Sequence, residues 1–169
     1  MKLKDKILIA ALLIVVGFGV WVGIGGLSNR AAPDINLSII DGRSLSLKAL
    51  QGKPVLVTFW ATDCVGCIRE MPHLVEFHQE FANKGLTIVG VAMYYDRPDR
   101  VLAMAEAKSL PYAIALDPKA EASRAFGDVR LTPTNFLIDA RGKIVEQKIG
   151  EFDPEAWRAR ISKLLEQNV

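Results

Sequence analysis

Short apolar runs alternate with longer segments of helical periodicity along most of this chain. The runs at 55–60 and 86–92 are almost continuously apolar and β-branched, which is typical of strands buried on both faces of a parallel sheet. Apolar side chains recur at helical spacing over residues 64–83, 98–108 and 153–165. Strands that alternate with helices in this way predict a three-layer α/β domain.

Two hairpins complete the pattern. An Asp-Gly turn between alternating apolar residues predicts an N-terminal hairpin over residues 35–47. A second turn at 139–142, which ends in glycine, joins expected strands at 134–138 and 143–149. A further strand is expected at 112–116, so the sheet combines parallel and antiparallel strands.

The N-terminus carries a different signal. Residues 7–27 contain no charge, and about 20 such residues span a bilayer. Three lysines precede this run and only Arg30 follows it closely, which places residues 1–6 in the cytoplasm by the positive-inside bias. We therefore expect a single transmembrane anchor, a tether at 28–34, and a domain at 35–169 outside the inner (cytoplasmic) membrane, in the periplasm or an equivalent space.

Two other interpretations of the apolar run fit its length and position less well. A core helix would not be apolar on every side at the extreme N-terminus. A cleaved signal peptide has a shorter apolar region, of about 7–15 residues, although Ala31-Ala32 offers a small-residue cleavage site. The uncleaved anchor is the better interpretation, and cleavage stays open.

Composition narrows the possible functions. The chain has 169 residues, half of them apolar, with 21 Lys and Arg against 19 Asp and Glu. This excludes a disordered chain and gives no basis for nucleic-acid binding. Without the three lysines and one aspartate of the first six residues, 18 basic and 18 acidic residues remain. The folded domain is formally neutral, and nothing requires more than a monomer.

Both cysteines of the chain, Cys64 and Cys67, stand three residues apart, directly after the first buried strand and at the start of a helix. This spacing in a first helical turn brings two sulfur atoms within bonding distance. The N–H groups and dipole of a helix N-terminus stabilise a thiolate, and α/β folds expose their chemistry at strand ends. Cys64 precedes the helix proper, so we expect it to be the exposed, attacking thiol and Cys67 the resolving one.

Other uses of the two thiols are less consistent with the sequence. A zinc site needs two more ligands, and His73 points away from Cys67 on the same helix. A disulfide that closes so small a loop stabilises little as a permanent staple. Thiolates also suit Cu(I), so a copper-binding assembly factor remains an alternative.

Two sequence motifs carry a resemblance to a known family. Residues 59–72, FWATDCVGCIREMP, resemble the active-site run of thioredoxin-like proteins, more narrowly the membrane-anchored TlpA/ResA/CcmG group of thiol–disulfide oxidoreductases. Residues 131–139, LTPTNFLID, are similar to the second motif of that group. Residues 98–116 correspond to the helix–strand insertion that separates the group from plain thioredoxin. The likeness covers about residues 34–167.

The resemblance assigns roles to individual residues. It implies that Pro133 follows a cis peptide bond and lies beside a redox-active Cys64–Cys67 disulfide. Trp60, Thr132 and Pro133 would border the bound substrate, whose extended chain pairs with exposed backbone there. Glu70 matches an acidic residue near the buried cysteine and could exchange a proton with it; a solvated helix glutamate is the alternative. No cofactor is implied beyond the disulfide.

Three positions depart from the family pattern. Asp63 stands where the group usually has Trp, and a negative charge there disfavours a neighbouring thiolate. Val65-Gly66 replaces the Gly-Pro of thioredoxin between the cysteines, so the redox potential cannot be carried over. Thr58 stands where thioredoxin has a buried Asp that helps to move protons, which adds interest to Glu70.

The resemblance implies a dithiol reductant of protein disulfides. Expected clients are the haem-binding cysteines of apocytochrome c or a copper-site assembly protein, and the expected electron donor is a membrane reductant related to DsbD or CcdA. Three alternatives stay open: a dithiol oxidase of the DsbA kind, the copper-binding assembly factor, and a tethered adaptor that needs neither cysteine.

Overall fold

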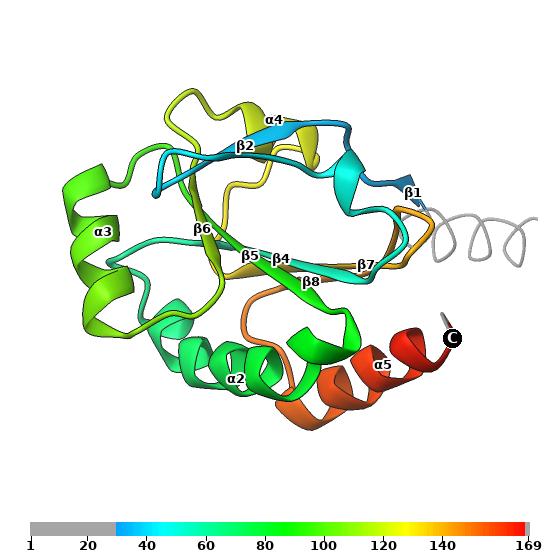
Figure 1. Cartoon of the computed structure of the whole chain (residues 1–169). Helices are drawn as coiled ribbons and strands as arrows, with labels where there is room; N and C mark the ends of the chain where they lie inside the picture. Colours follow the sequence, from blue (N-terminus) through cyan, green and yellow to red (C-terminus); the bar gives the residue numbers. More distant parts are fainter. Residues whose placement is uncertain (1–29, 168–169) are drawn as a thin grey trace, which may run out of the picture.

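A computed structural model describes residues 30–167 (Figure 1). Within these residues the strands form one eight-stranded sheet in the order β1-β8-β7-β4-β5-β6-β2-β3. The strands are β1 (Arg30–Ala31), β2 (Asn36–Ile39), β3 (Ser44–Ser46), β4 (Val55–Trp60), β5 (Thr87–Ala92), β6 (Ala113–Leu116), β7 (Thr134–Ile138) and β8 (Lys143–Ile149). The helices are α2 (Val65–Phe81), α3 (Pro98–Ala107), α4 (Glu121–Ala125) and α5 (Pro154–Glu166), with short 3-10 turns η1 (Lys48–Leu50) and η2 (Ala82–Lys84).

The sheet is mixed, as predicted. Strands β4, β5 and β6 run parallel, whereas β7 pairs antiparallel with both β4 and β8. The two expected hairpins are present as β2–β3 and β7–β8. The thioredoxin-like α/β fold, with its N-terminal hairpin and helix–strand insertion, is confirmed in this part of the chain.

Two apolar cores lie on opposite faces of the sheet. Alternate residues of β4 supply them: Leu56 and Trp60 contribute to one core, and Val57 and Phe59 to the other. Helices α2, α3 and α5 pack on the first face, and α4 and the β2–β3 hairpin cover the second (Figure 1). Because β4 is buried on both sides, its continuous apolar sequence follows directly from its central position.

Helix α2 begins where the sequence predicted. Cys64 is its N-cap, and Pro72 lies inside it. The chain then passes through η2 to Gly85, which has a φ of 108°. Glycine adopts this left-handed conformation without the steric cost that other residues pay, so the predicted helix stop is at the expected place.

The N-terminal region differs from the expectation at one point. Part of the expected tether at 28–34 belongs to the sheet, because Arg30 and Ala31 form β1 and pair with Ile144 and Lys143 of β8. The Arg30 guanidinium also donates to the carbonyl of Phe126 at 2.6 Å. Two residues of edge strand carry no periodicity, which is why the sequence pattern did not reveal them.

The expected membrane anchor at 7–27 and the cytoplasmic segment at 1–6 lie outside the described residues. Among the helices of residues 30–167, none combines the length and apolar character that crossing a bilayer requires.

Candidate active site

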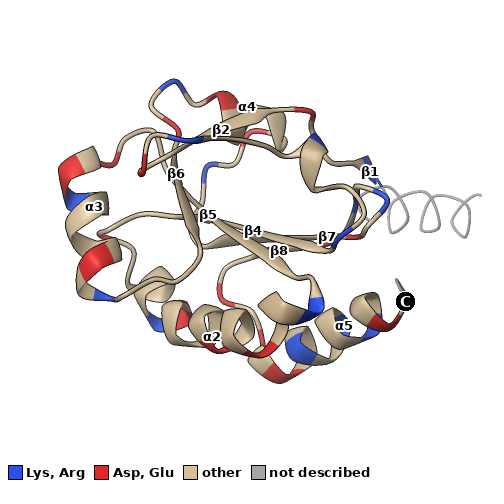
Figure 2. Ribbon diagram, in the orientation of Figure 1, with Lys and Arg blue, Asp and Glu red and all other residues tan. Residues whose placement is uncertain are grey.

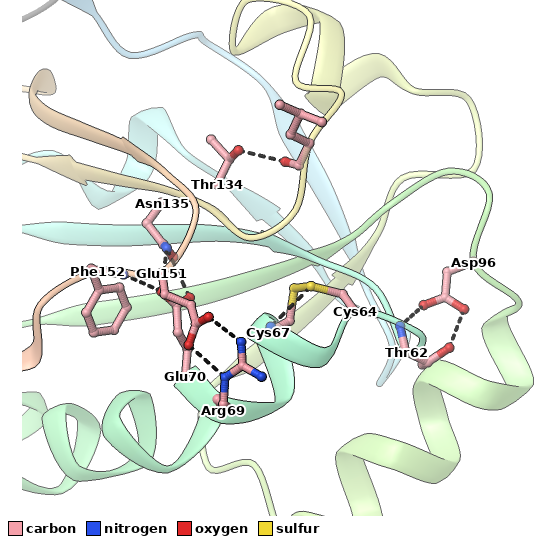
Figure 3. The surroundings of a disulfide bond; sticks show 11 residues. Thr62, Cys64, Cys67, Arg69, Glu70, Asp96, Thr134, Asn135, Glu151 and Phe152 are labelled. Atoms are coloured by element: carbon pink, nitrogen blue, oxygen red, sulfur yellow. Dashed lines mark hydrogen bonds and ion pairs between the residues drawn. A yellow bond between two sulfur atoms is a disulfide. The ribbon is translucent and has the colours of Figure 1, made fainter.

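Cys64 and Cys67 form a disulfide at the N-terminal end of α2 (Figure 3). Their Cα atoms are 5.3 Å apart. The backbone N–H of Cys67 donates to the Cys64 sulfur at 3.1 Å, so this sulfur caps the helix. A helix N-terminus supplies unpaired N–H groups and a positive dipole end, which favour negative charge on that sulfur once the bond is reduced.

The two cysteines differ in accessibility as expected. Cys64 is half-buried, whereas Cys67 is only 3% exposed and belongs to the core beneath α2. Between them, Val65 presents an apolar side chain to solvent. An incoming disulfide can therefore reach Cys64, while Cys67 is positioned to react only with a group already attached to Cys64.

The second motif lies against the disulfide loop. The Thr132–Pro133 peptide bond is cis, as the resemblance implied. A β-carbon built on Gly66 would stand 3.3 Å from Cδ of Pro133, which shows how closely the two segments pack. Pro133 is buried and its carbonyl accepts the N–H of Gly150 at 2.8 Å, whereas Thr132 is half-buried. These contacts bring α2, the start of β7 and the end of β8 together.

Glu70 is a buried carboxyl rather than a solvated one. Its side chain is 2% exposed, one helical turn after Cys67. Its Oε1 accepts the backbone N–H of Phe152 at 2.7 Å, and both oxygens accept from Nδ2 of Asn135, at 3.2 and 3.0 Å. Burial raises the pKa of Glu70 to about 7, although these hydrogen bonds oppose the rise. The group can therefore take up or release a proton near neutral pH.

Trp60 differs from the expectation of a substrate contact. It is 3% exposed and packs within the core on the α2 side of the sheet. A β-carbon on Gly90 would meet its Nε1 at 3.1 Å, so the indole fills the space that the glycine leaves. Because β4 is a central strand, its last residue is packed into the core and offers little surface to a substrate.

Three contacts at the site were not foreseen. Asp96, after β5, accepts two hydrogen bonds from Thr62, just before the disulfide. Glu151, after β8, pairs with Arg69 of α2. The Asn135 amide holds Glu70 (Figure 3). Each joins segments between 34 and 82 residues apart, and no spacing in the sequence marks such a pair.

The remaining candidates lie elsewhere. Among residues 30–167, no group of three or more His, Cys, Asp or Glu side chains is arranged to hold a metal ion. His73 faces Glu76 at 3.6 Å. Tyr94 and Tyr95, in the loop after β5, are about half exposed and stack edge to face.

Comparison with known proteins places this site in a family. Residues 27–165 match the redoxin family. The chain is 34% identical over 136 residues to thiol-disulfide oxidoreductase ResA of Bacillus thuringiensis, across 80% of this chain and 77% of that protein.

Solved structures agree in fold. A thiol:disulfide interchange protein of the thioredoxin family from Chlorobium tepidum superposes with a TM-score of 0.74 at 27% identity, over 81% of this chain and 97% of that one. The thioredoxin domain of a thiol-disulfide oxidoreductase from Bacteroides vulgatus gives 0.71 at 26% identity, with the same coverage. With its paired cysteines at the start of α2, the chain therefore belongs to the redoxin family and is a thiol–disulfide oxidoreductase of the ResA type.

Proposed function

We propose that this protein is a membrane-anchored, extracytoplasmic reductase of protein disulfides. The observation that carries the proposal is the asymmetry of the Cys64–Cys67 pair. One sulfur caps α2 at the surface, and the other is buried one turn before a buried carboxyl, Glu70. This arrangement suits a reaction in which one thiol attacks a partner and the other releases it.

The proposed reaction has two exchange steps. The Cys64 thiolate attacks one sulfur of a substrate disulfide, forms a mixed disulfide, and expels the other substrate sulfur as a thiolate that takes a proton from solvent. Cys67 then gives its proton to Glu70, and its thiolate attacks the Cys64 sulfur. This attack expels the second substrate sulfur as a thiolate, which takes a proton from solvent. Two electrons pass to the substrate, and the protein is left with its own disulfide.

The location and partners rest on the sequence. The apolar run at 7–27, with three lysines before it, supports an anchor that holds the domain outside the cytoplasm. Such a domain needs a source of electrons, for which we propose a membrane reductant of the DsbD or CcdA type. We propose apocytochrome c or a copper-site assembly protein as clients, since the cysteine pairs of both must be reduced before they bind haem or copper.

The test uses the full chain in nanodiscs, with a mixed-disulfide trap. Cys64→Ser should abolish exchange with a protein disulfide, whereas Cys67→Ser should retain the first step and accumulate a covalent adduct at Cys64. Retained exchange in the Cys64→Ser variant would disprove the mechanism.

The direction of transfer is tested by the reduction potential of the same preparation, equilibrated with redox buffers. A value near that of thioredoxin, about −270 mV or lower, supports a reductase, and a value near that of DsbA, about −120 mV, assigns an oxidase instead.

A further inference from the structure

The two polar atoms of the buried Asn135 amide differ in their hydrogen bonding. Asn135 is in β7, directly opposite Thr58 of β4, and is fully buried on the α2 side of the sheet. Its Nδ2 donates to both oxygens of Glu70. Its Oδ1 is buried too, yet has no hydrogen-bond partner among the described residues.

An unpartnered buried acceptor normally costs free energy. A carboxylate needs donors, whereas a carboxylic acid also needs an acceptor for its own O–H. The side-chain amide of asparagine carries one of each on the same carbon. A half-turn about the terminal bond would exchange Nδ2 for Oδ1 opposite Glu70, so one residue can serve both forms of the carboxyl.

We propose that Asn135 is a positioning residue for proton transfer, whose amide presents Nδ2 to ionised Glu70 and, after a half-turn, Oδ1 to protonated Glu70. This inference rests on the proposed function, because it supplies the device by which Glu70 keeps one orientation while it accepts the proton of Cys67. Glu70 is the group that exchanges the proton; Asn135 acts through it.

Groups from several neighbouring segments act on Glu70. Some favour its ionised form and others disfavour it. The backbone N–H of Phe152, before α5, donates to Oε1. Glu151 opposes the ionised form of Glu70 and Lys148 of β8 favours it. Tyr112, before β6, is buried beside the carboxyl, and burial together with Glu70 raises the pKa of this phenol. Asn135 is distinct among these because its side chain is hydrogen-bonded to both Glu70 oxygens and also carries an acceptor on the same carbon.

Loss of the Asn135 amide should change the titration of Glu70 in one direction. Without Nδ2, ionised Glu70 keeps the N–H of Phe152 but loses its second donor, and burial still disfavours the charge. Leucine has nearly the shape of asparagine and offers neither donor nor acceptor. Asn135→Leu should therefore move the titration of Glu70 to higher pH, by about one pH unit for the loss of one such donor.

The first test needs no substitution at Asn135. In the full chain in nanodiscs, the carboxyl carbon of Glu70 and the side-chain amide nitrogen of Asn135 are followed by NMR from pH 5 to 9. The two signals should change with one shared midpoint, and the Asn135 signal should stop titrating in Glu70→Gln. If the Asn135 amide signal stays constant while Glu70 titrates, the inference is wrong. The proposed thiol–disulfide exchange would be unaffected by that result.

The second test is a double-variant cycle on the exchange rate, with glutathione disulfide as the probe. Asn135→Leu should move the pH profile of the exchange rate to higher pH when Glu70 is present. It should leave the profile unchanged in the Glu70→Gln background. An equal effect in both backgrounds would mean that Asn135 acts on stability alone, and the inference would fall. A Glu70→Gln profile like that of the parent would remove the proton-transfer role of Glu70 itself, whereas the Cys64 and Cys67 variants test the exchange mechanism separately.

Discussion

Asp96 holds Thr62 through two hydrogen bonds, from the backbone N–H at 2.6 Å and from the hydroxyl at 2.8 Å. One carboxylate oxygen also accepts the N–H of Arg97. These bonds fix the loop after β5 to the residue two places before Cys64. The segments that follow β4 and β5 are thus joined through one carboxylate, two residues before the disulfide.

Removal of this anchor should loosen the disulfide loop. Asp96→Ala leaves the N–H of Thr62 unpaired, and the loss of a hydrogen bond to a charged acceptor costs about 1–3 kcal/mol. We expect a lower free energy of unfolding in urea and faster hydrogen exchange at residues 61–64. Asp99→Ala is the matched control, because Asp99 lies in the first turn of α3 and its ion pair with Arg97 is exposed. Equal losses in the two variants would contradict the anchoring role.

Glu70 should make the stability of the fold depend on pH. Its pKa is about 7 in the folded protein against 4.5 ordinarily, so the folded state binds this proton more tightly than the unfolded state. The contribution of this proton to the free energy of unfolding is fully present below about pH 4.5 and is lost as the pH rises through 7. The difference corresponds to about 3 kcal/mol.

Urea unfolding at pH 4.5, 6 and 7.5 measures this dependence. Glu70→Gln keeps the shape of the side chain and removes the titration, so its curve should be flatter than that of the parent over this window. Parallel curves for the two proteins would show that the pH dependence comes from other groups.

Gly90 should not tolerate a larger side chain. A β-carbon there would lie 3.0 Å from Cδ1 of Ile114 and 3.1 Å from Nε1 of Trp60. Because both neighbours are buried, Gly90→Ala should destabilise the domain by about 1–3 kcal/mol. In the double variant with Trp60→Phe, the loss should be smaller than the sum of the two single losses, as measured by urea unfolding; strict additivity would argue against the contact.

The ion pair between Arg69 and Glu151 should govern charge selection at the disulfide rather than stability. Both side chains are about half exposed, and ion pairs in contact with solvent contribute little to folding. Glu151 also lies beside Gly66, next to the disulfide loop. Glu151→Gln leaves the charge of Arg69 unbalanced there, so reaction with anionic glutathione disulfide should accelerate several-fold relative to cationic cystamine.

Salt should remove this change in preference, because it screens exposed charges. Glu76→Gln makes the same charge change further along α2 and serves as the control. A similar ratio of rates in the two variants would mean that net charge alone is responsible.

Local patterns predicted most of the fold. Strands β4 and β5 are short apolar runs because the sheet buries them on both faces. Burial on both faces leaves almost no polar position in either segment, so the sequence pattern alone identifies them. Helix α2 was recognisable from its periodicity. The two cysteines were found for the same reason, since a pair at i and i+3 is a local feature.

Contacts between distant segments could not be predicted in this way. Asn135 meets Glu70 because β7 pairs with β4 in the middle of the sheet and every second side chain of a strand points to the same face, here the one that carries α2. Nothing in the residues around either one specifies the other. The same is true of Asp96 and Glu151, and the burial of Trp60 followed from the central position of its strand rather than from its motif.

The pairing of β1 with the start of β8 also defines a polarity of the whole domain. Arg30 stands opposite Ile144, whereas Ile149, at the other end of β8, stands opposite Thr134, next to Pro133. Ile144 and Ile149 are five residue steps apart along the strand, a distance of about 17 Å. Arg30 therefore stands at one end of the sheet, whereas Pro133 and the Cys64–Cys67 disulfide lie toward the other end. The exposed sulfur chemistry and the start of the described chain thus occupy opposite ends of β8.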